Sequence, residues 1–331
     1  MRGDSSSCFG SPNFSHFSQF SSLLSIYLLS NMNRIKFFVL LVLLVSFIFP
    51  LKAAKITAVK VGSKISVTID GKYFTSYIFS GDEKYPFFYP VNGPLSGGSV
   101  TSMRNGEYPH HSSLFFGCDL VNGGNYWQEG LERGRIISVN AEILKEGGDT
   151  VIISDECIWS RPGALSPVKD SRRYTITSVS ASVKQMDVEI SMEMLIDVTI
   201  KKTNHSLFSG RMAADLSVKN GGTLVNAEGE SGEKATFGKA SPWMDFSGKR
   251  GDFTEGMAIL QHPTNPWYPS PWFTRDYGFF SPTPMYWPAN DKETVLKKGE
   301  KLVLRYRVIV HGGSVSEARI AELFELYKKA N

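Results

Sequence analysis

The chain has 331 residues, of which 36 are basic and 32 are acidic, for a net charge of +4. The first 54 residues hold four of the basic residues and one of the acidic ones, so the remainder is close to neutral. A near-neutral domain lacks the basic footprint that binds phosphate backbones, and we therefore expect no nucleic-acid partner.

The N-terminal stretch has the composition of a targeting segment rather than of a folded domain. Residues 1–31 hold ten serines and precede Met32, which we interpret as a second start. A basic pair and the apolar run Phe37–Phe49 follow, as in a secretory signal peptide, and the run is too short for a transmembrane helix. We predict that residues 1–54 are an upstream start plus a signal peptide and that 55–331 form one exported domain, periplasmic or secreted, without stable membrane insertion. An uncleaved membrane anchor is the alternative.

From residue 55 onward, polar and apolar residues alternate over many short stretches, which is typical of β-strands. We expect strands at residues 65–69, 73–79, 87–89, 114–119, 135–145, 150–158, 173–184, 187–201, 207–218 and 301–311. Asp70-Gly71 and Gly147-Gly148 have the composition of hairpin turns. Long alternating strands with turns at short intervals predict an all-β fold, a large antiparallel β-sandwich.

One helix is predicted, at the C-terminus. The segment Ser314-Val315-Ser316-Glu317 is a capping box. After it, Ile320, Leu323, Phe324 and Tyr327 recur at helical spacing and would share one face. We expect this short helix to pack on a sheet.

Cys118 and Cys157 are the cysteines of the predicted exported domain. An oxidising compartment permits a disulfide between them, and two buried free thiols are an equally good interpretation. Their state is left open.

The chain lacks the short sequence motifs that indicate cofactor binding. We find no dinucleotide-binding glycine pattern, P-loop, paired-cysteine motif or nucleophile elbow. We therefore expect no cofactor and no metal. A three-histidine metal site, built from His110 or His111 with His262 and either His311 or Asp245, is an alternative without local support.

The adjacent residues His110 and His111 are the first candidates for acid–base catalysis, because histidine changes charge near neutral pH. On a regular strand their side chains would point to opposite faces, so one would enter a given site, unless the backbone after Pro109 is irregular. The alternative is one buried, hydrogen-bonded histidine and one on the surface. His262, in a second polar stretch, is the next candidate for acid–base work.

Trp243 and Asp245 lie two residues apart and would share one face of a strand. An aromatic ring beside a carboxylate suits a sugar, whose C–H groups stack on the ring while its hydroxyls donate to the acid. We therefore take Asp245 as a candidate catalytic carboxylate and Trp243 as a candidate sugar platform. Packing of the tryptophan on the core is the alternative.

The stretch from 261 to 278 combines polar and aromatic residues with four prolines that stiffen it. Asn265, Trp272, Arg275 and Asp276 are its candidate binding residues, although Arg275 and Asp276 could form a structural ion pair. Asn92, in a rigid turn, could orient a ligand hydroxyl or bond its own backbone. We expect these residues and the paired histidines to meet at one site.

Several short motifs occur in a characteristic order. They are Tyr-Pro-Val-Asn-Gly-Pro at 89–94, Pro-His-His-Ser-Ser-Leu-Phe-Phe-Gly at 109–117, the following Asp119, Val121, Asn122, Gly123 and Trp127, Trp-Met-Asp-Phe-Ser-Gly at 243–248, His-Pro-Thr-Asn-Pro at 262–266, and Trp272 with Arg-Asp-Tyr-Gly at 275–278. Over roughly residues 73–312 the chain resembles the bacterial family whose domain is catalogued as "methane oxygenase PmoA". Methane oxidation is not expected, because no long apolar span follows residue 50.

The resemblance implies a secreted β-rich protein that is distantly similar to galactose-mutarotase-like supersandwich proteins. Mutarotases of that class use a histidine acid and a carboxylate base around a sugar ring. His110 or His111 would take the histidine role, and Asp245 would replace the late-strand glutamate, which has no match here. Asn122 and Trp127, which lie in the shared motifs, would contact substrate.

These observations predict an exported carbohydrate-active protein that performs acid–base chemistry on a sugar or glycoside, as an epimerase, lyase or hydrolase. One alternative is a non-catalytic glycan-binding module whose binding depends on Trp127, Trp243, Trp267 and Trp272. Another is a metal-dependent enzyme. The sugar, the bond acted on and the oligomeric state are left open.

Overall fold

The computed structural model describes residues 54–330, apart from 129, 204 and 285–292. The chain from Ala54 onward is one compact unit. The predicted signal peptide lies outside the described residues, so cleavage and export stay predictions.

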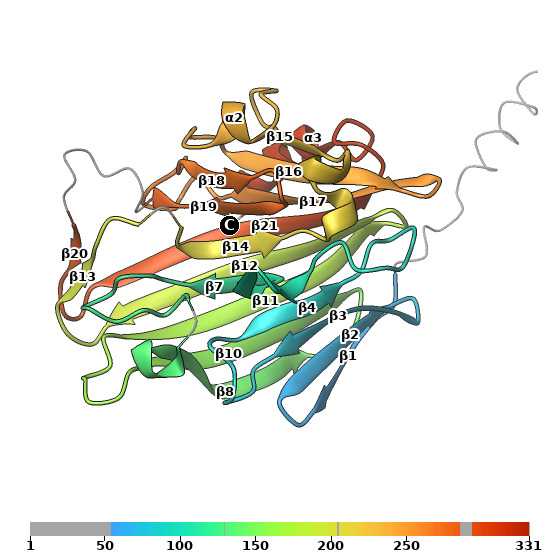
Figure 1. Cartoon of the computed structure of the whole chain (residues 1–331). Coiled ribbons are helices and arrows are strands. Elements are labelled where there is room, and N and C mark those ends of the chain that lie inside the picture. The colour runs from blue at the N-terminus through green and yellow to red at the C-terminus, as the bar shows by residue number, and fades with distance from the viewer. Residues whose placement is uncertain (1–53, 129, 204, 285–292, 331) are drawn as a thin grey trace, which may run out of the picture. The chain divides into compact units, whose positions relative to one another are not determined.

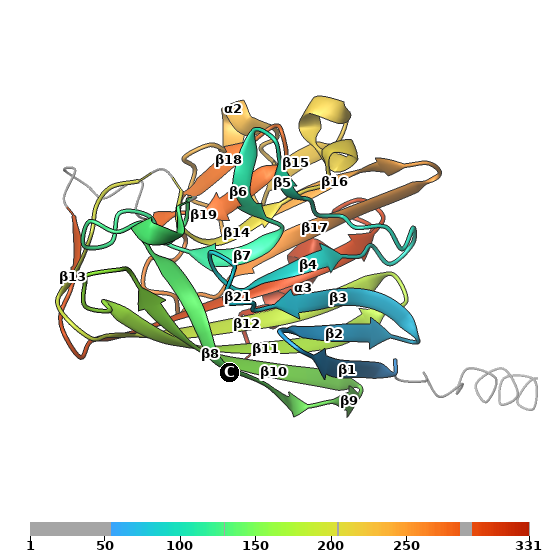
Figure 2. The same cartoon turned by 60° about the horizontal axis from the view of Figure 1, so that its bottom comes forward.

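Two large antiparallel sheets pack face to face (Figures 1 and 2). The first sheet has nine strands, in the order β18 (Trp272–Arg275), β19 (Phe279–Pro282), β14 (Leu207–Arg211), β7 (Leu114–Gly117), β4 (Phe87–Val91), β3 (Lys72–Ile78), β2 (Lys64–Ile69), β1 (Ile56–Val61) and β9 (Gly147–Gly148). The second has eight, in the order β15 (Thr223–Asn226), β16 (Trp243–Arg250), β17 (Phe253–Gln261), β21 (Lys301–Gly312), β12 (Val183–Met194), β11 (Val168–Ser180), β10 (Thr150–Ser160) and β8 (Arg135–Lys145).

Smaller elements decorate the sandwich. Two short two-stranded sheets accompany the two large ones: the hairpin of β5 (Met103–Asn105) with β6 (Tyr108–Ser112), and the long-range pair of β13 (Val198–Ile200) with β20 (Thr294–Leu296). The helices are α2 (Glu233–Thr236), α3 (Ile320–Tyr327) and three single turns of 3₁₀ helix at Leu131–Arg133, Ala214–Leu216 and Val218–Asn220.

The main core lies between the two sheets, because every second residue of each strand points inward. Tyr77 of the first sheet packs on Tyr174 of the second, with ring centroids 5.1 Å apart. Phe208 and Tyr306 stack across the same interface at 5.0 Å. Fully burying a side chain of this size stabilises the fold by roughly 1.5–3 kcal/mol, so such pairs fix how the sheets face each other.

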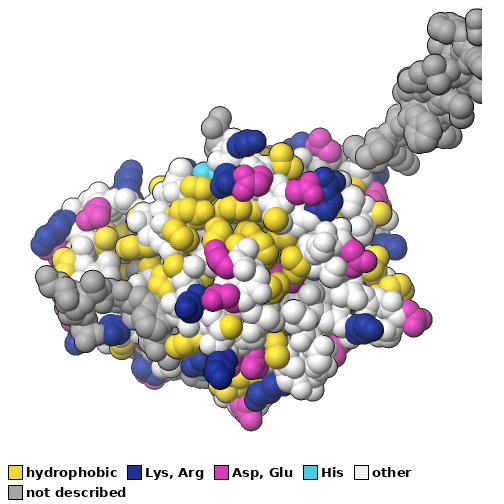
Figure 3. All heavy atoms as spheres, turned by 90° about the horizontal axis from the view of Figure 1, so that it is seen from above, with side chains coloured by type: hydrophobic (Ala, Val, Ile, Leu, Met, Phe, Trp, Pro, Cys, Tyr) yellow, Lys and Arg dark blue, Asp and Glu magenta, His cyan; other side chains and the backbone are white. Residues whose placement is uncertain are grey.

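A second apolar cluster lies on the outer face of the eight-stranded sheet. It joins Trp243, Ala258 and Ile309 of the sheet to Ile320 and Phe324 of α3. Figure 3 shows hydrophobic side chains gathered between charged ones on the end of the molecule that carries α2 and β15.

The predicted all-β sandwich and C-terminal helix are confirmed. The residues predicted to form one helical face, Ile320, Leu323, Phe324 and Tyr327, are the buried residues of α3. Ser314 and Glu317 exchange the hydrogen bonds of the capping box. The helix nevertheless begins only at Ile320, because Arg319 adopts a left-handed backbone conformation with φ 57°.

Some predicted boundaries were wrong. Gly147-Gly148 is not merely a turn, since the pair forms β9 and bonds to Ile56 and Thr57 at the edge of the other sheet. The turn between the longest strands lies at residues 181–182 rather than 185–186, because the polar–apolar alternation runs through both positions. The stretch 207–218 is a strand only as far as Arg211.

Cys118 and Cys157 are both free thiols buried in the core. Among the described residues, no helix has the length and apolar character that crossing a membrane requires.

Candidate functional site

The two predicted catalytic histidines lie on the outer face of the nine-stranded sheet, at its β7–β14–β19 end. Gly210 points inward, since a Cβ there would lie 3.0 Å from Met257 of the opposite sheet. Arg211 and Phe279, one residue along each paired strand, therefore point outward. Figure 2 shows the β5–β6 hairpin standing over this end of the sheet.

The hairpin builds an aromatic stack on this face. His111 stacks on Phe279 of the sheet, with ring centroids 4.4 Å apart, and on Tyr108 of its own strand at 4.9 Å. Tyr108 in turn stacks on Tyr277 of the β18–β19 turn at 4.5 Å. His110 meets His111 edge to face at 4.5 Å. The stack holds His111 buried and leaves His110 half-buried.

His111 is uncharged at physiological pH. Burial lowers its pKa to about 2, and the neighbouring His110, Arg211 and His205 act in the same direction. Its Nδ1 is buried and has no hydrogen-bond partner among the described residues. A neutral imidazole in this position can donate or accept one hydrogen bond but does not carry charge.

A histidine–carboxylate pair lies on the same face. Nε2 of His205, just before β14, is 3.3 Å from Oδ2 of Asp119, just after β7. The Asp119 carboxylate is buried and its Oδ1 accepts a hydrogen bond from the amide of Leu120 at 2.8 Å. The His205 side chain stays 17% exposed.

Rings connect this pair to the paired histidines. Trp127 lies 5.1 Å from the ring of His205 and 6.0 Å from Phe279, the residue under His111. Phe273 lies 6.0 Å from His205 and 5.5 Å from Phe279. The histidine face is the name used below for this region, which comprises Tyr108, His110, His111, Asp119, Trp127, His205, Arg211, Phe273, Tyr277 and Phe279.

Sequence reasoning missed His205, Arg211, Tyr108 and Tyr277, and it did not give Asp119 a catalytic role. Two signals were available. His205 is one of the few histidines of the domain, and Arg211 is a charge at the end of an otherwise uncharged strand. Neither signal predicts that His205 and Arg211, at the two ends of β14, lie on the same surface as the β5–β6 hairpin.

Asp245 and Trp243 do not join the histidine face, which corrects the prediction. Both point to the outer side of the other sheet, where Trp243 packs under α3. Oδ2 of Asp245 is 2.7 Å from Nε2 of His311, and both side chains are fully buried. The whole thickness of the sandwich therefore separates Asp245 from His111.

His262 is also placed elsewhere, and the predicted convergence with His110 and His111 was wrong. Its Nδ1 lies 2.8 Å from Oγ1 of Thr264 and its Nε2 lies 3.2 Å from the carbonyl of Ala330. Its ring packs edge to face on Tyr327 of α3 at 4.9 Å. Burial lowers the pKa of His262. These contacts attach the C-terminus to the sheet.

The predicted binding residues Asn122 and Asn265 have amides that are engaged with backbone. Asn122 donates to the carbonyl of Asp197 and accepts from the amide of Thr199. Asn265 donates to the carbonyl of Arg305 and accepts from its amide. Both side chains thus form the hydrogen bonds that a neighbouring strand would form, and their role in ligand binding stays a prediction.

Three of the predicted tryptophan platforms, Trp127, Trp243 and Trp272, are wrong because their side chains are buried, whereas Trp267 is half-buried. Trp272 is 0% exposed and donates from Nε1 to the carbonyl of Ser241. Trp243 and Trp127 are also buried. Tyr108 and Tyr277, by contrast, are half-buried and keep part of their rings exposed.

Arg275 and Asp276 are not paired with each other. Nη1 of Arg275 lies 3.0 Å from Oε1 of Glu233 on α2, and Asp276 accepts a hydrogen bond from the amide of Glu233. The guanidinium of Arg275 lies over Phe273, 4.3 Å from the ring centre. Arg275 therefore borders the histidine face, whereas Asp276 fixes α2 against the β18–β19 turn.

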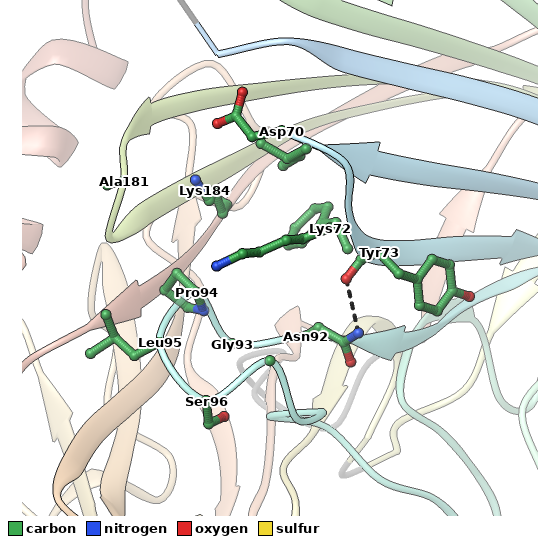
Figure 4. A pocket seen from close by; sticks show the side chains of 13 residues that line it. Asp70, Lys72, Tyr73, Asn92, Gly93, Pro94, Leu95, Ser96, Ala181 and Lys184 are labelled. Carbon is green, nitrogen blue, oxygen red and sulfur yellow. Dashed lines mark hydrogen bonds between the residues drawn. The ribbon is translucent and has the colours of Figure 1, made fainter.

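Asn92 lies in a different place, a pocket of about 350 Å³ shown in Figure 4. Its Nδ2 donates to the carbonyl of Tyr73 at 3.0 Å. The amino groups of Lys72 and Lys184 point into the pocket, beside Asp70. Burial lowers the pKa of Lys184, and the nearby charge of Asp70 opposes this effect. None of the predicted catalytic residues lines this pocket.

The alternative three-histidine metal site does not assemble. His110 and His111 lie on one outer face, whereas His262, His311 and Asp245 lie on the other. Among the residues that the structure describes, no three His, Cys, Asp or Glu side chains are grouped as a metal site requires.

Comparison with known proteins places the sequence in a family. Residues 64–325 match the model described as "Family of unknown function (DUF6807)". The chain belongs to this family. No curated protein matches the sequence of this chain. The similarity to PmoA-like proteins stays a prediction.

Solved structures similar to this DUF6807 protein include galactose 1-epimerase from Lactobacillus acidophilus NCFM, which is 7% identical with a TM-score of 0.39 over 78% of this chain and 98% of that chain. A putative kojibiose phosphorylase from the human microbiome is 8% identical with a TM-score of 0.35 over 83% of this chain and 33% of its own. A glycoside hydrolase family 97 enzyme from Pseudoalteromonas sp. strain K8 is 12% identical with a TM-score of 0.33 over 80% of this chain and 35% of its own. Likeness at this level does not bear on chemistry, which depends on the residues of the site.

Proposed function

We propose that this protein is a carbohydrate-active enzyme that transfers protons on a sugar or glycoside bound at the histidine face. The observation that carries the proposal is the contact of His205 with the buried carboxylate of Asp119. A carboxylate beside an imidazole restricts the orientation of the ring. That arrangement suits a general acid or base, whose contribution to rate is typically 10²- to 10⁴-fold.

The two other histidines have different roles in this proposal. His111 is locked neutral in the aromatic stack, so it would position a ligand rather than exchange protons. His110 is half-buried and lines a depression of about 280 Å³ together with Tyr85 and Arg104. It would contact the ligand from the rim.

The surface around the pair supports a sugar as the ligand. Tyr108 and Tyr277 offer half-buried aromatic rings, and His110 offers a polar group beside them. Sugars combine C–H faces that stack on rings with hydroxyls that form hydrogen bonds, so a mixed aromatic and polar surface fits them. Asp119 takes the carboxylate role that the sequence assigned to Asp245.

The test is a turnover assay on a panel of reducing sugars and glycosides, read by NMR for epimerised, eliminated and hydrolysed products. We expect His205→Ala to lower kcat by about 10²- to 10⁴-fold and Asp119→Asn to lower it in the same direction. His262→Ala is the matched histidine control and should turn over at the wild-type rate.

A different result separates the alternatives. If sugars bind but the wild-type protein yields no product, the chain is a glycan-binding module. If His205→Ala retains full turnover, the assignment of the acid–base pair is wrong.

We also propose that the protein is exported. We further propose that it is related to the PmoA-like proteins. The support is the basic pair and apolar run before residue 50 and the ordered motifs quoted above. Intact-mass measurement of protein from the expressing cell tests export. A mass that includes residues 32–54 would contradict cleavage.

A further inference from the structure

Three arginines are buried among the described residues, and only two of them have a carboxylate partner. Arg172 lies 2.6 Å from a carboxylate oxygen of Asp170, and Arg307 lies 2.5 Å from one of Asp187. Arg211 is 4% exposed, yet no described carboxylate lies within ion-pair distance of it. A buried charge without a counter-charge is destabilising, so this exception requires an explanation.

Two of the three guanidinium nitrogens of Arg211 also lack hydrogen-bond partners in the described part of the chain. Its Nε and Nη1 are buried and have no partner among the described residues. The guanidinium lies over Tyr277, 4.5 Å from the ring centre, and over Tyr108 at 5.7 Å. These cation–π contacts are made by the face of the guanidinium and leave its Nε and Nη1 groups without acceptors.

The surroundings do not supply a hidden counter-charge. Glu107 is exposed and its charge raises the pKa of Arg211, but burial outweighs this effect and lowers it overall. His111, which stacks on Tyr108, is neutral and has a buried Nδ1 without a partner among the described residues. Both side chains pack on Tyr108, His111 with its ring and Arg211 with its guanidinium.

We infer that the ligand of the histidine face carries a carboxylate, which accepts hydrogen bonds from the guanidinium of Arg211, with His111 beside it. This inference rests on the proposed function, because it names the substrate class of the same site: a sugar that contains a uronic acid. A planar carboxylate matches the fork of a guanidinium and supplies the single negative charge that Arg211 lacks.

The position of Arg211 also bears on ligand size. Arg211 ends β14 and His205 lies just before its start. At roughly 3.4 Å per residue, the five-residue strand separates its two ends by about 14 Å. A ligand that reaches both groups therefore has more than one sugar ring, and the acidic ring is the one at the Tyr277 end.

The binding experiment compares a uronic-acid disaccharide with its methyl ester by isothermal titration calorimetry. The ester keeps the shape and removes the charge. We expect the wild-type protein to bind the acid on the order of 10- to 100-fold more tightly than the ester. Arg211→Met should bind both alike, and Arg211→Lys, which keeps the charge without the fork, should fall between.

A second measurement is independent of the choice of sugar. Removing an uncompensated buried charge should leave the melting temperature of ligand-free Arg211→Met equal to or above that of the wild type. Arg307→Met is the matched control and should melt at a lower temperature, because it leaves Asp187 without its partner.

Several outcomes overturn the inference. Equal binding of acid and ester, no binding of the acid, or tighter binding of a sulfated disaccharide than of the uronate would each do so. A fall in melting temperature for Arg211→Met as large as that for Arg307→Met would show that Arg211 is a structural residue. If acid and ester bind alike while turnover still requires His205, the inference fails and the proposed function stands.

Discussion

His311 donates a hydrogen bond from Nε2 to Oδ2 of Asp245 across the strand that lies between them, at 2.7 Å. Its Nδ1 is 3.1 Å from the carbonyl of Gly313, which can only accept, so Nδ1 carries a proton, and Asp245 favours a second proton on Nε2 by raising the pKa of His311 despite burial. The ring passes over Gly256, where a Cβ would lie 2.8 Å from Nε2. The result is a fully buried imidazolium–carboxylate pair that joins β21 to β16.

The first prediction concerns the removal of one partner. Asp245→Asn leaves a buried imidazolium without its counter-charge, so we expect the free energy of unfolding to fall by about 3–5 kcal/mol. The double variant Asp245→Leu with His311→Met removes both charges and should lose less than Asp245→Asn alone. Urea unfolding monitored by tryptophan fluorescence measures both. A double variant that is less stable than the single one would contradict the ion pair.

The second prediction concerns pH. Burial alone would lower the pKa of His311, but the charge and hydrogen bond of Asp245 raise it overall. Because the folded-state pKa lies above the ordinary value of about 6.5, the stabilisation is complete below about pH 6.5 and is lost as the pH rises through the folded-state pKa. Unfolding free energies of the wild type and the double variant between pH 5.5 and 9.5 should converge as the pH rises. A difference that stays constant would contradict this.

The third prediction concerns His262. His262→Ala removes the contacts with Thr264 and Ala330 and the packing on Tyr327. We expect a loss of about 1–3 kcal/mol in stability and faster amide exchange in α3, with no change in binding at the histidine face. Loss of sugar turnover at unchanged stability would return His262 to the list of catalytic candidates.

The fourth prediction concerns the two buried thiols. Burial raises the pKa of Cys118 to about 12 and that of Cys157 well above its ordinary value. Thiolates react and thiols do not, so the folded domain should not react with a thiol reagent at pH 8. After unfolding without reductant, residues 55–331 should yield both thiols. Their absence in that step would show a disulfide.

The fifth prediction concerns the wall of the pocket in Figure 4. The buried Glu255 carboxylate accepts hydrogen bonds from the amides of Leu95 and Ser96 at 2.7 and 2.8 Å. Glu255→Gln weakens these charge-assisted bonds, so we expect a loss of about 1.5–3 kcal/mol and faster amide exchange at 93–97. Asp70→Asn, across the pocket and exposed, is the control and should exchange as the wild type does.

The candidate site could be predicted only in part. His110 and His111 do lie in a group of polar and aromatic side chains, and Arg275 borders it. Asp245 was assigned to the same group because it shares a strand face with an aromatic residue. Strand alternation predicts that Asp245 and Trp243 share one face of their strand. It does not predict which of the two sheets contains that strand.

Local patterns were sufficient for the fold class, because strand alternation and the apolar face of α3 are set by residues close in sequence. Side-chain partners depended on strand order, which sequence spacing does not encode. The nine-stranded sheet takes β14 and β19 from the second half of the chain and sets them beside β7, and this brings His205 to Asp119, 86 positions earlier in the sequence, and Arg211 to Tyr108. The eight-stranded sheet takes β16, β17 and β21, and so carries Asp245 and His262 to the opposite face. Only the tertiary structure decided this division. The two sheets bury their inner faces against each other, so each outward-pointing side chain lies on the outer face of one sheet or of the other, and these two faces are on opposite sides of the sandwich.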